Sequence, residues 1–372
     1  MKVENLKLRK ILDSRVNYTV EAEINGKRAA APSGASTGTH EAKCFVPQHL
    51  EEIEDMLQRT KEEIFTQEEF DDALHTFDQT DDFSRLGASA IASSFAFKKA
   101  SGFEHTNKFP LPLSNVIGGG EHGGNTSIQE FLVLPVNAES FPEAVETNKK
   151  IYHELKERYS QKIMGMNDEG ALITSMNDEQ TLKALKKIAD KYDARIGLDI
   201  AASEFYENGE YNFSSMHEKF SGEEMVDFVD TLIEKFDLVY VEDPFDQEDF
   251  KNHAKLTKMH PDVLICGDDL FTTNYERLEE GIEHGACNSL IVKPNQIGTV
   301  TAAEHTVEVA DENGYTPVIS HRSGETCDAT ISDLALEWEC PIIKAGIADI
   351  RIAKLNRLLR LWEKKEDPEI SY

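Results

Sequence analysis

The sequence contains little cysteine, comparatively little basic charge and no long apolar run. Its 372 residues include five cysteines, an odd number without any CxxC spacing. A disulfide framework or a zinc site is therefore not expected, and a reducing cytoplasm is the predicted location. No apolar run reaches about eighteen residues, so no transmembrane helix is predicted. The first ten residues, MKVENLKLRK, lack the apolar core of a signal peptide, so we expect a mature N-terminus.

Acidic residues outnumber basic ones, at 69 Asp and Glu against 39 Lys and Arg, and the formal net charge is −30. Nucleic acid and anionic membranes both need a basic surface, so neither is expected as a partner. The simplest interpretation of the excess is a solvated acidic surface. A salty cytoplasm and clustered carboxylates that hold cations are the alternatives. An anionic substrate would require metals or local Lys and Arg to reverse this field inside its pocket.

The first hundred residues predict a small α+β unit. The expected elements are strands at residues 2–10, 17–24 and 27–32, with the hairpin signal Asn25-Gly26 before the third, and helices at 49–64, 68–77 and 87–101. Residues 103–113 carry two prolines and no periodicity, which predicts a domain junction. We therefore expect an N-terminal α+β capping domain at residues 1–104 and a second domain at residues 105–372.

The second domain is predicted to be a closed βα barrel. Short apolar, β-branched runs recur at residues 194–200, 238–244, 263–269, 288–294, 315–321 and 340–346. Their continuous apolar character suits strands that are covered on both faces. Amphipathic helices are predicted between them, at residues 221–236, 299–312 and 327–338. These units fit a TIM-like α/β barrel of roughly 250 residues with parallel strands. An open doubly wound sheet is the competing architecture, but no GxGxxG motif follows an early strand.

Each of the six predicted strands ends in a residue with metal-binding or charge chemistry. In chain order these are Asp199, Glu242 with Asp243, Asp268 with Asp269, Lys293, His321 with Arg322, and Lys344. Any one of them alone is more simply a helix cap or a surface residue, but that interpretation does not explain the repetition. Because barrel active sites lie at the carboxyl ends of the strands, these side chains are expected to converge on one pocket.

The residue types in this pocket predict metal-assisted proton abstraction. Three carboxylates without nearby His or Cys ligands favour a hard cation, with Mg²⁺ as the default. A lysine that is desolvated or close to another cation loses its proton more readily and can act as a general base. A base beside a Lewis acid is suited to removing a proton α to a carboxylate.

Other segments are suggestive but ambiguous. His321-Arg322-Ser323-Gly324 offers a guanidinium, a hydroxyl and backbone N–H groups for an anion, although alone it is more simply a turn with a capping serine. Glycine-rich segments at residues 33–38 and 118–124 are either loops that close over a substrate or plain surface turns. Gln129-Glu130 and Asp168-Glu169-Gly170 add carboxylates that the sequence alone does not locate.

The chain resembles the enolases over nearly its whole length. The motifs that carry the resemblance include, in order, ILDSR (11–15), SGASTG (33–38), HEA (40–42), QEF (129–131), DEG (168–170), EDPF (242–245), GDDLF (267–271), SHRSGET (320–326) and IIKAG (342–346). Each motif alone is weak, but the set in this order is specific. The resemblance implies a lyase that reversibly dehydrates 2-phosphoglycerate to phosphoenolpyruvate in glycolysis and gluconeogenesis. It also implies two Mg²⁺ per active site and a homo-oligomer, with a dimer as the default.

Matching motif positions imply a role for each site residue. The tighter Mg²⁺ would be held by Asp199, Glu242 and Asp268, and the second would be bound with the help of Ser36. Acid–base catalysis would use Lys293 to remove the C2 proton and Glu169, assisted by Glu130, to protonate the departing C3 hydroxyl. Substrate contacts would come from Arg322 and Ser323 at the phosphate, Lys344 at the carboxylate end, and His122, Gln129 and His321 along the pocket.

The chain departs from the usual enolase pattern in its loops. Val16 and Tyr18 replace the usual Gly and Pro, the loop between His122 and Gln129 is shorter, and a short deletion follows Lys344. These departures keep two alternatives open. One is an enolase-like paralogue that acts on another phosphorylated hydroxy-acid. The other is a non-catalytic binding protein that uses a C-terminal apolar stripe, although this stripe more simply packs the last helix on the barrel; its members are Leu355, Leu358, Leu359 and Trp362.

Overall fold

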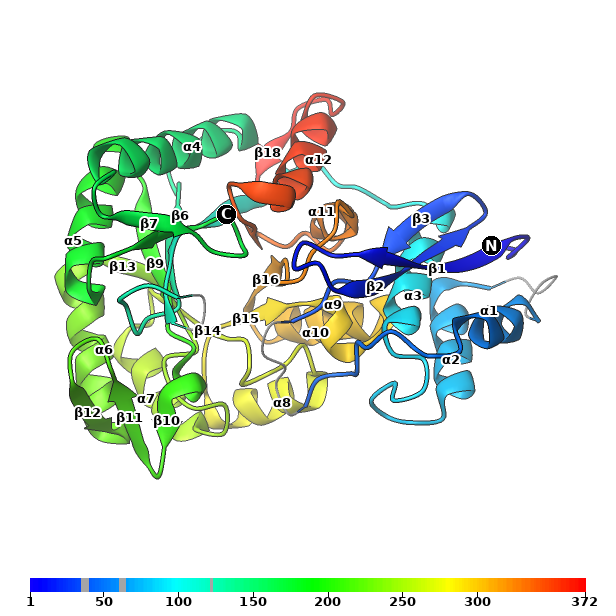
Figure 1. Ribbon diagram of the computed structural model, residues 1–372, viewed down its shortest axis with the longest axis horizontal. Coiled ribbons are helices and arrows are strands. Elements are labelled where there is room, and N and C mark those ends of the chain that lie inside the picture. The colour runs from blue at the N-terminus through cyan, green and yellow to red at the C-terminus, as the bar shows by residue number, and fades with distance from the viewer. Residues whose placement is uncertain (35–39, 60–64, 121–122) are drawn as a thin grey trace.

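The computed structural model describes residues 1–34, 40–59, 65–120 and 123–372, and it contains a barrel and a smaller α+β unit (Figure 1). The smaller unit opens with an antiparallel sheet of β1 (Leu6–Leu12), β2 (Tyr18–Ile24) and β3 (Lys27–Ala30). It continues with the helices α1 (Leu50–Gln58), α2 (Gln67–Asp78) and α3 (Ala88–Ser101). Because α3 is rich in Ala and Ser, its first ten residues are buried on every face, and the helix packs closely on β2 and β3.

Eight strands close into a barrel, which confirms the predicted fold class. In order around the ring they are β5 (Leu111–Gly118), β6 (Glu130–Leu134), β9 (Arg195–Asp199), β13 (Leu238–Glu242), β14 (Leu264–Gly267), β15 (Ser289–Val292), β16 (Thr316–Ser320) and β17 (Ile342–Lys344). The ring closes because β17 pairs with β5. The six strands predicted from apolar runs are all present, as β9 and β13 to β17.

One barrel strand runs against the others, so the expectation of an all-parallel barrel was wrong. β6 is antiparallel to both of its neighbours, β5 and β9. In the described part of the connection from β5 to β6 there is no helical crossover of the kind that a parallel pair requires. As a result β6 begins, rather than ends, at the mouth of the barrel. Glu130, its first residue, therefore pairs in register with Asp199, the last residue of β9.

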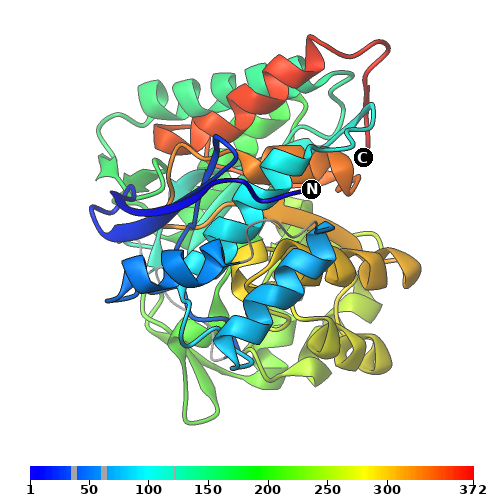
Figure 2. The same cartoon turned by 90° about the vertical axis from the view of Figure 1, so that its right-hand side faces the viewer.

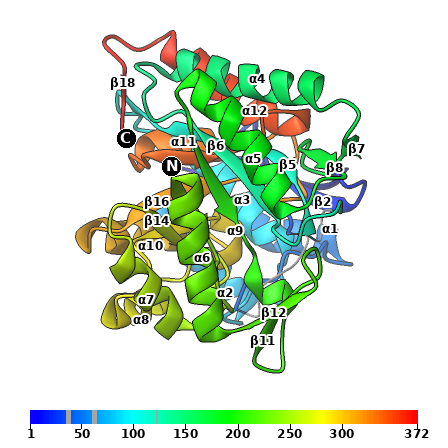
Figure 3. The same cartoon turned by 90° about the vertical axis from the view of Figure 1, so that its left-hand side faces the viewer.

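Helices cover the outside of the barrel, and Figure 3 shows α4, α5 and α6 on the side away from the smaller unit. The barrel helices are α4 (Phe141–Arg158), α5 (Asp178–Ala189), α6 (Gly222–Phe236), α7 (Phe250–Met259), α8 (Tyr275–His284), α9 (Pro294–Ile297), α10 (Val300–Glu312), α11 (Thr330–Glu337) and α12 (Ile352–Trp362). The capping box predicted at Ser221 is formed with Glu224. Within the described ranges, no helix combines the length and the apolar character needed to cross a membrane.

Short strands complete the fold. β7 (Ile163–Met166) and β8 (Leu172–Thr174) form a hairpin that extends the sheet from β5, and the turn of this hairpin carries Glu169. β10 (Tyr206–Glu207), β11 (Glu210–Phe213) and β12 (Glu218–Ser221) form a small separate sheet. β4 (Lys108–Phe109) pairs with β18 (Glu369–Ile370), next to the end of the chain.

Some predicted boundaries differ from the structure. β1 begins at Leu6 rather than at residue 2, and the helix predicted to reach residue 64 ends at Gln58, with residues 60–64 outside the described ranges. The segment at residues 103–113, predicted to be a junction without regular structure, contains β4 and the start of β5, while the junction itself stays a prediction. Pro112 lies near the start of the strand, where proline is tolerated, and it was misread as a break. The domain boundary between residues 104 and 105 stays a prediction.

The smaller unit caps a helix of the barrel, and Figure 2 shows it in front of the barrel. The first N–H groups of α10 have no partner within the helix. Asp71 on α2 accepts hydrogen bonds from the Thr301 N–H at 3.0 Å and from the Thr301 hydroxyl at 2.8 Å. The Ser94 hydroxyl on α3 accepts from the Val300 N–H at 2.9 Å. Helices from one end of the chain therefore stabilise the start of a helix far along it.

Replacement of Asp71 by Ala is expected to lower the free energy of unfolding by about 2 kcal/mol, because it leaves a partly buried N–H of α10 without its acceptor. Asp72→Ala, at the exposed neighbouring position, is the matched control and should change stability by less than about 0.5 kcal/mol. Urea unfolding followed by circular dichroism measures both. Equal stability of the two variants would contradict a capping role for Asp71.

Candidate active site

A narrow cavity of about 50 Å³ lies at the carboxyl ends of the barrel strands. Its lining includes most of the residues that the sequence assigned to the site, namely Gln129, Glu130, Glu169, Asp199, Asp268, Lys293, His321, Arg322, Ser323 and Lys344. Glu242 is fully buried and joins this group through its contact with Lys344. Ser36 and His122 lie outside the described residues. The structure thus brings the described members of the predicted site together.

The ammonium of Lys344 lies at the centre of one carboxylate set. Its Nζ is 2.9 Å from Asp199 Oδ2, 2.8 Å from Glu242 Oε1 and 2.7 Å from Glu242 Oε2. It is also 2.7 Å from Glu130 Oε2, which the antiparallel β6 delivers to the same end of the barrel. The hydroxyl of Tyr240 donates to Glu242 Oε2 at 2.7 Å. Two of the predicted metal ligands are therefore held by one lysine.

The third predicted metal ligand, Asp268, pairs with the other lysine of the cavity. The ammonium of Lys293 donates to Asp268 Oδ2, and Gln296 Nε2 donates to Asp268 Oδ1 at 3.0 Å. The carboxylate of Asp243 orients this segment, because it accepts from the N–H groups of Asp268 at 2.9 Å and of Asp269 at 2.8 Å. The end of β14 is thereby fixed by the residue that follows β13.

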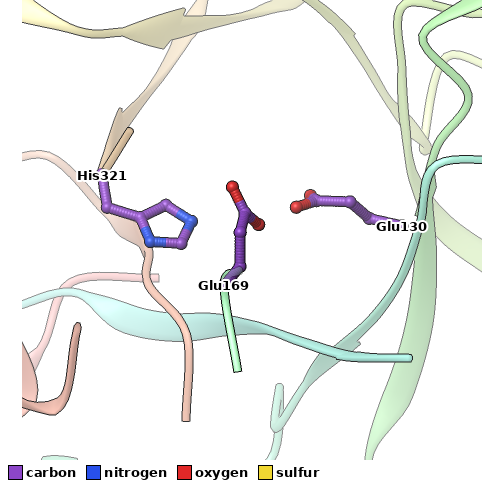
Figure 4. Close-up of side chains that lie close together, drawn as sticks. All are labelled: Glu130, Glu169 and His321. Carbon is purple, nitrogen blue, oxygen red and sulfur yellow. The ribbon is translucent and has the colours of Figure 1, made fainter. Parts of the chain in front are cut away.

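Glu130, Glu169 and His321 form a second group, in which Glu169 lies between the other two (Figure 4). The Asn115 amide of β5 donates to Glu130 Oε1 at 2.8 Å and to Glu169 Oε2 at 3.3 Å. The Ser323 hydroxyl donates to Glu169 Oε1 at 3.0 Å. Two carboxyl groups that the sequence could not locate therefore face each other in the predicted site.

Burial and mutual repulsion shift the pKa values of these groups. Burial raises the pKa of Glu242 to about 8, and the neighbouring Asp199 adds to the shift. Burial and Asp268 together raise the pKa of Asp269 to about 7. Burial acts to raise the pKa of Asp268 as well, but the ammonium of Lys293 outweighs it and holds this pKa below its usual value. Burial lowers the pKa of His321 well below its usual value, which keeps the imidazole neutral.

The donor set fits a divalent cation. Among the described residues that line the cavity, eight are Asp or Glu and three are Lys or Arg. The raised pKa values of Glu242 and Asp269 show that this excess of buried negative charge is unfavourable without further positive charge. Oxygen ligands without Cys suit a hard cation. A divalent metal would be held by carboxylates of this cavity, among which Asp243, Asp268 and Asp269 gather closely.

Arg322 is held by residues to which the sequence analysis assigned no role. Its guanidinium is 2.8 Å from Glu41 Oε2 and donates to Asn295 Oδ1 at 3.2 Å. Glu41 belongs to the HEA motif, and Asn295 closely follows the predicted base, Lys293. Motif membership was therefore the available signal. The contact itself was not predictable from spacing, because the arginine and the glutamate are 281 residues apart.

Arg351 is completely buried and joins two loops of the cavity. One guanidinium nitrogen donates to the carbonyl of Asp168 at 2.9 Å. The other donates to the carbonyls of Arg322, at 3.2 Å, and of Ser323. One side chain thus connects the turn that carries Glu169 with the segment predicted to bind an anion. No pattern in the sequence had indicated this connection.

The N-terminal unit reaches the same cavity through a close approach of two backbones. Ser33 and Gly324 exchange two N–H to carbonyl hydrogen bonds of 2.8 Å each. A Cβ atom at position 324 would lie 2.2 Å from Ser33 Oγ and 2.9 Å from Asp13 Oδ2, so a larger residue would force these side chains to move. The described start of the segment predicted at residues 33–38 therefore lies against the predicted anion-binding segment.

The closed barrel and the acidic, lysine-containing cavity at its mouth define the class as a βα-barrel enzyme with a site for acid–base chemistry. Two family models match the chain: "Enolase, N-terminal domain" at residues 3–111 and "Enolase, C-terminal TIM barrel domain" at residues 106–370. The chain belongs to the enolase family.

Similar proteins support this assignment over nearly the whole chain. A protein named enolase from Natronomonas pharaonis is 44% identical, over 96% of this chain and 98% of the relative. The enolase of Halobacterium salinarum is 42% identical, over 98% of this chain and 99% of the relative. The enolase of Archaeoglobus fulgidus is 39% identical, over 100% of this chain and 99% of the relative.

Replacement of Arg351 by Lys is expected to lower the free energy of unfolding by about 3 kcal/mol, because one ammonium cannot serve carbonyls on two loops. The control is Arg158→Lys, which alters an exposed pair with Glu154 and should cost less than about 0.5 kcal/mol. Both are measured by denaturant unfolding. A loss at Arg351 no larger than at Arg158 would show that the loops are held by other contacts.

Proposed function

We infer that this protein is an enolase, a carbon–oxygen lyase that reversibly dehydrates 2-phosphoglycerate to phosphoenolpyruvate. The observation that carries the inference is the placement of the proposed base and acid. Lys293 follows β15, and Glu130, which is proposed to assist the acid Glu169 and lies beside it, begins β6, four strands away in either direction around the closed ring of eight. Acid and base therefore approach a molecule in the cavity from opposite sides. The family membership supports the same reaction.

The roles of the reacting groups follow from this arrangement. Lys293 removes the C2 proton, for which its side chain must be the neutral amine. Burial acts to lower the pKa of Lys293, but the contact with Asp268 favours the ammonium and raises this pKa, so the contact has to weaken before Lys293 can act as a base. Glu169 protonates the departing C3 hydroxyl. Burial raises the pKa of Glu130 well above its usual value, and the neighbouring Glu169 adds to the shift. The raised pKa of Glu130 favours its protonated form, which suits a residue that assists a general acid.

Two Mg²⁺ per site are proposed as cofactors. Asp199, Glu242 and Asp268 would hold the tighter ion, and Ser36 would help to bind the second. Bound Mg²⁺ would neutralise the substrate carboxylate and stabilise the negative charge that develops when the C2 proton leaves. The excess of buried carboxylates over basic side chains in the described part of the cavity supports this assignment.

Substrate recognition is proposed to use the remaining residues. Arg322 and Ser323 bind the phosphate, and Lys344 contacts the carboxylate end. Gln129, His321 and His122 complete the pocket wall. Arg322 is the group best suited to a phosphate, because a planar guanidinium can donate two hydrogen bonds to it. An enolase-like paralogue acting on another phosphorylated hydroxy-acid, or a non-catalytic binding protein, would have less need of this intact set. No observation favours either.

A cytoplasmic, glycolytic and gluconeogenic role and assembly into a dimer or higher homo-oligomer complete the proposal. Three large apolar side chains on the β1–β2 hairpin support assembly: Leu12, Val16 and Tyr18 are 55%, 77% and 68% exposed. Leu12 and Tyr18 are direct cross-strand partners, so the exposed groups adjoin. Val16 is the most exposed of the three. Its backbone has a φ of 62°, in a region that disfavours β-branched residues.

With Mg²⁺ and 2-phosphoglycerate, the purified protein is expected to produce the ultraviolet absorbance of phosphoenolpyruvate, and a chelator should abolish it. Lys293→Ala should lower kcat by about 10³-fold or more, because it removes the base. Lys255→Ala, at an exposed lysine that pairs with Glu223, is the control and should leave kcat unchanged. A wild-type protein that binds Mg²⁺ but shows no turnover would contradict the proposed reaction.

Light scattering after gel filtration is expected to give at least twice the mass of the chain. Tyr18→Asp should shift this mass toward the monomer, because it places a charge among the exposed apolar groups of the hairpin. Tyr372→Asp, at a tyrosine that is 49% exposed at the end of the chain, is the matched control and should leave the mass unchanged. A monomeric wild type would refute the assembly.

A further inference from the structure

We propose that Lys344 acts as an internal cation, whose ammonium occupies the carboxylate set of the metal site in the metal-free protein and must leave before a divalent cation binds. The inference rests on the proposed function, because it takes Asp199 and Glu242 as metal ligands. It also goes further, because the proposed function gives Lys344 only a contact with substrate. The juxtaposition that carries it is one ammonium surrounded by three carboxylates.

The contacts of Lys344 compete directly with metal coordination. Both carboxylate oxygens of Glu242 are within 2.8 Å of the ammonium, and Asp199 Oδ2 is 2.9 Å away. Oxygen ligands lie about 2.0–2.1 Å from Mg²⁺, which is smaller than an ammonium and carries twice its charge. A divalent cation bound to these oxygens would lie close to the ammonium, and the two positive charges would repel each other. A metal that binds Glu242 and Asp199 therefore competes with Lys344 for these carboxylates.

Burial makes the ammonium necessary in the metal-free protein. Glu130, Asp199 and Glu242 are at most 5% exposed, and so is Lys344. Three neighbouring buried carboxylates without a counter-ion would repel one another and favour protonation. Lys344 supplies the missing charge and holds the three side chains near the position that a metal requires.

The other basic residues in the described lining of the cavity are engaged elsewhere. Lys293 pairs with Asp268, and Arg322 pairs with Glu41. Lys344 is therefore the cation that serves the set of Asp199 and Glu242. Asp268, the third proposed metal ligand, is thus paired with a different lysine from Asp199 and Glu242. A metal would bring the three carboxylates onto one ion.

The lysine thus has two alternative positions, and they set an order of binding. While its ammonium is held by the carboxylates, it is unavailable to substrate. After a metal has replaced it, the same ammonium is released toward the cavity, where it contacts the carboxylate end of the substrate. Metal therefore binds before substrate. The held position also weakens apparent metal affinity, because only the fraction of molecules with Lys344 displaced can accept the ion.

Lys344 could instead support the metal-loaded site, and this alternative predicts a different change in Mg²⁺ affinity when the lysine is removed. If the ammonium oriented Glu242 and Asp199 for the metal, a variant without it would bind Mg²⁺ more weakly. If the ammonium competes with the metal, the same variant binds Mg²⁺ more tightly. The sign of the change in affinity therefore separates the two roles.

Calorimetric titration of the metal-free protein with Mg²⁺, without substrate, tests the proposal. Lys344→Met removes the ammonium but retains most of the side-chain volume. It is expected to bind Mg²⁺ about tenfold or more tightly, because the competing fraction is gone. Its metal-free melting temperature should fall and its rise on Mg²⁺ addition should exceed that of the wild type. Unchanged or weaker Mg²⁺ binding by Lys344→Met would overturn the proposal.

Lys354→Met is the matched control, because Lys354 is equally buried and pairs with Glu325 rather than with a proposed metal ligand. It should lose stability without a change in Mg²⁺ affinity, and a gain like that of Lys344→Met would also overturn the proposal. If Lys344→Met does not fold, crystal structures of the wild type with and without Mg²⁺ decide. A Lys344 Nζ that stays within hydrogen-bonding distance of both Glu242 oxygens in the Mg²⁺ form would refute displacement. Turnover of 2-phosphoglycerate is measured separately, so failure of the proposed reaction is distinguishable from failure of this inference.

Discussion

Compensation of buried negative charge is the constraint on which the mouth of this barrel depends. Strand ends deliver carboxylates to one cavity, where burial, together with repulsion from Asp199, raises the pKa of Glu242 to about 8. Two lysines neutralise different members of this set: Lys344 pairs with Asp199 and Glu242, and Lys293 pairs with Asp268. Under the proposed competition between Lys344 and the metal, the groups that balance charge in the metal-free protein are also the groups that a bound cation would rearrange. Stability and readiness for the metal are opposed in this site.

The direction of one strand decides how the site is divided. Because β6 is antiparallel, its first residue lies among the last residues of the other strands, and Glu130 comes beside Asp199. The β7–β8 turn brings Glu169 to the same side, while Lys293 stands across the ring. The N-terminal unit adds Glu41 against the segment predicted to bind an anion. A single cavity thus draws its parts from both units and from widely separated segments.

Much of the site was predictable because its residues recur at a simple position. Each apolar run that became a strand from β9 to β17 ends in a polar or charged group, and parallel strands carry such ends to one rim. The contacts of Glu41 and Arg351 were not predictable in this way. They depend on loops whose path is set by packing across more than a hundred residues of sequence, and local patterns contain no information on such distances.

The sequence by itself determined the periodicities of strands and helices, the chemistry at the strand ends and the motifs that resemble an enolase, because these are properties of neighbouring residues. Only the tertiary structure decided that β6 runs backwards, that Glu130 and Glu169 face each other, and which lysine pairs with which carboxylate. Each lysine has several carboxylates nearby with which it could form an ion pair. The pairing that forms is set by the register of the barrel and by the depth of burial, and both arise only when the whole ring has closed.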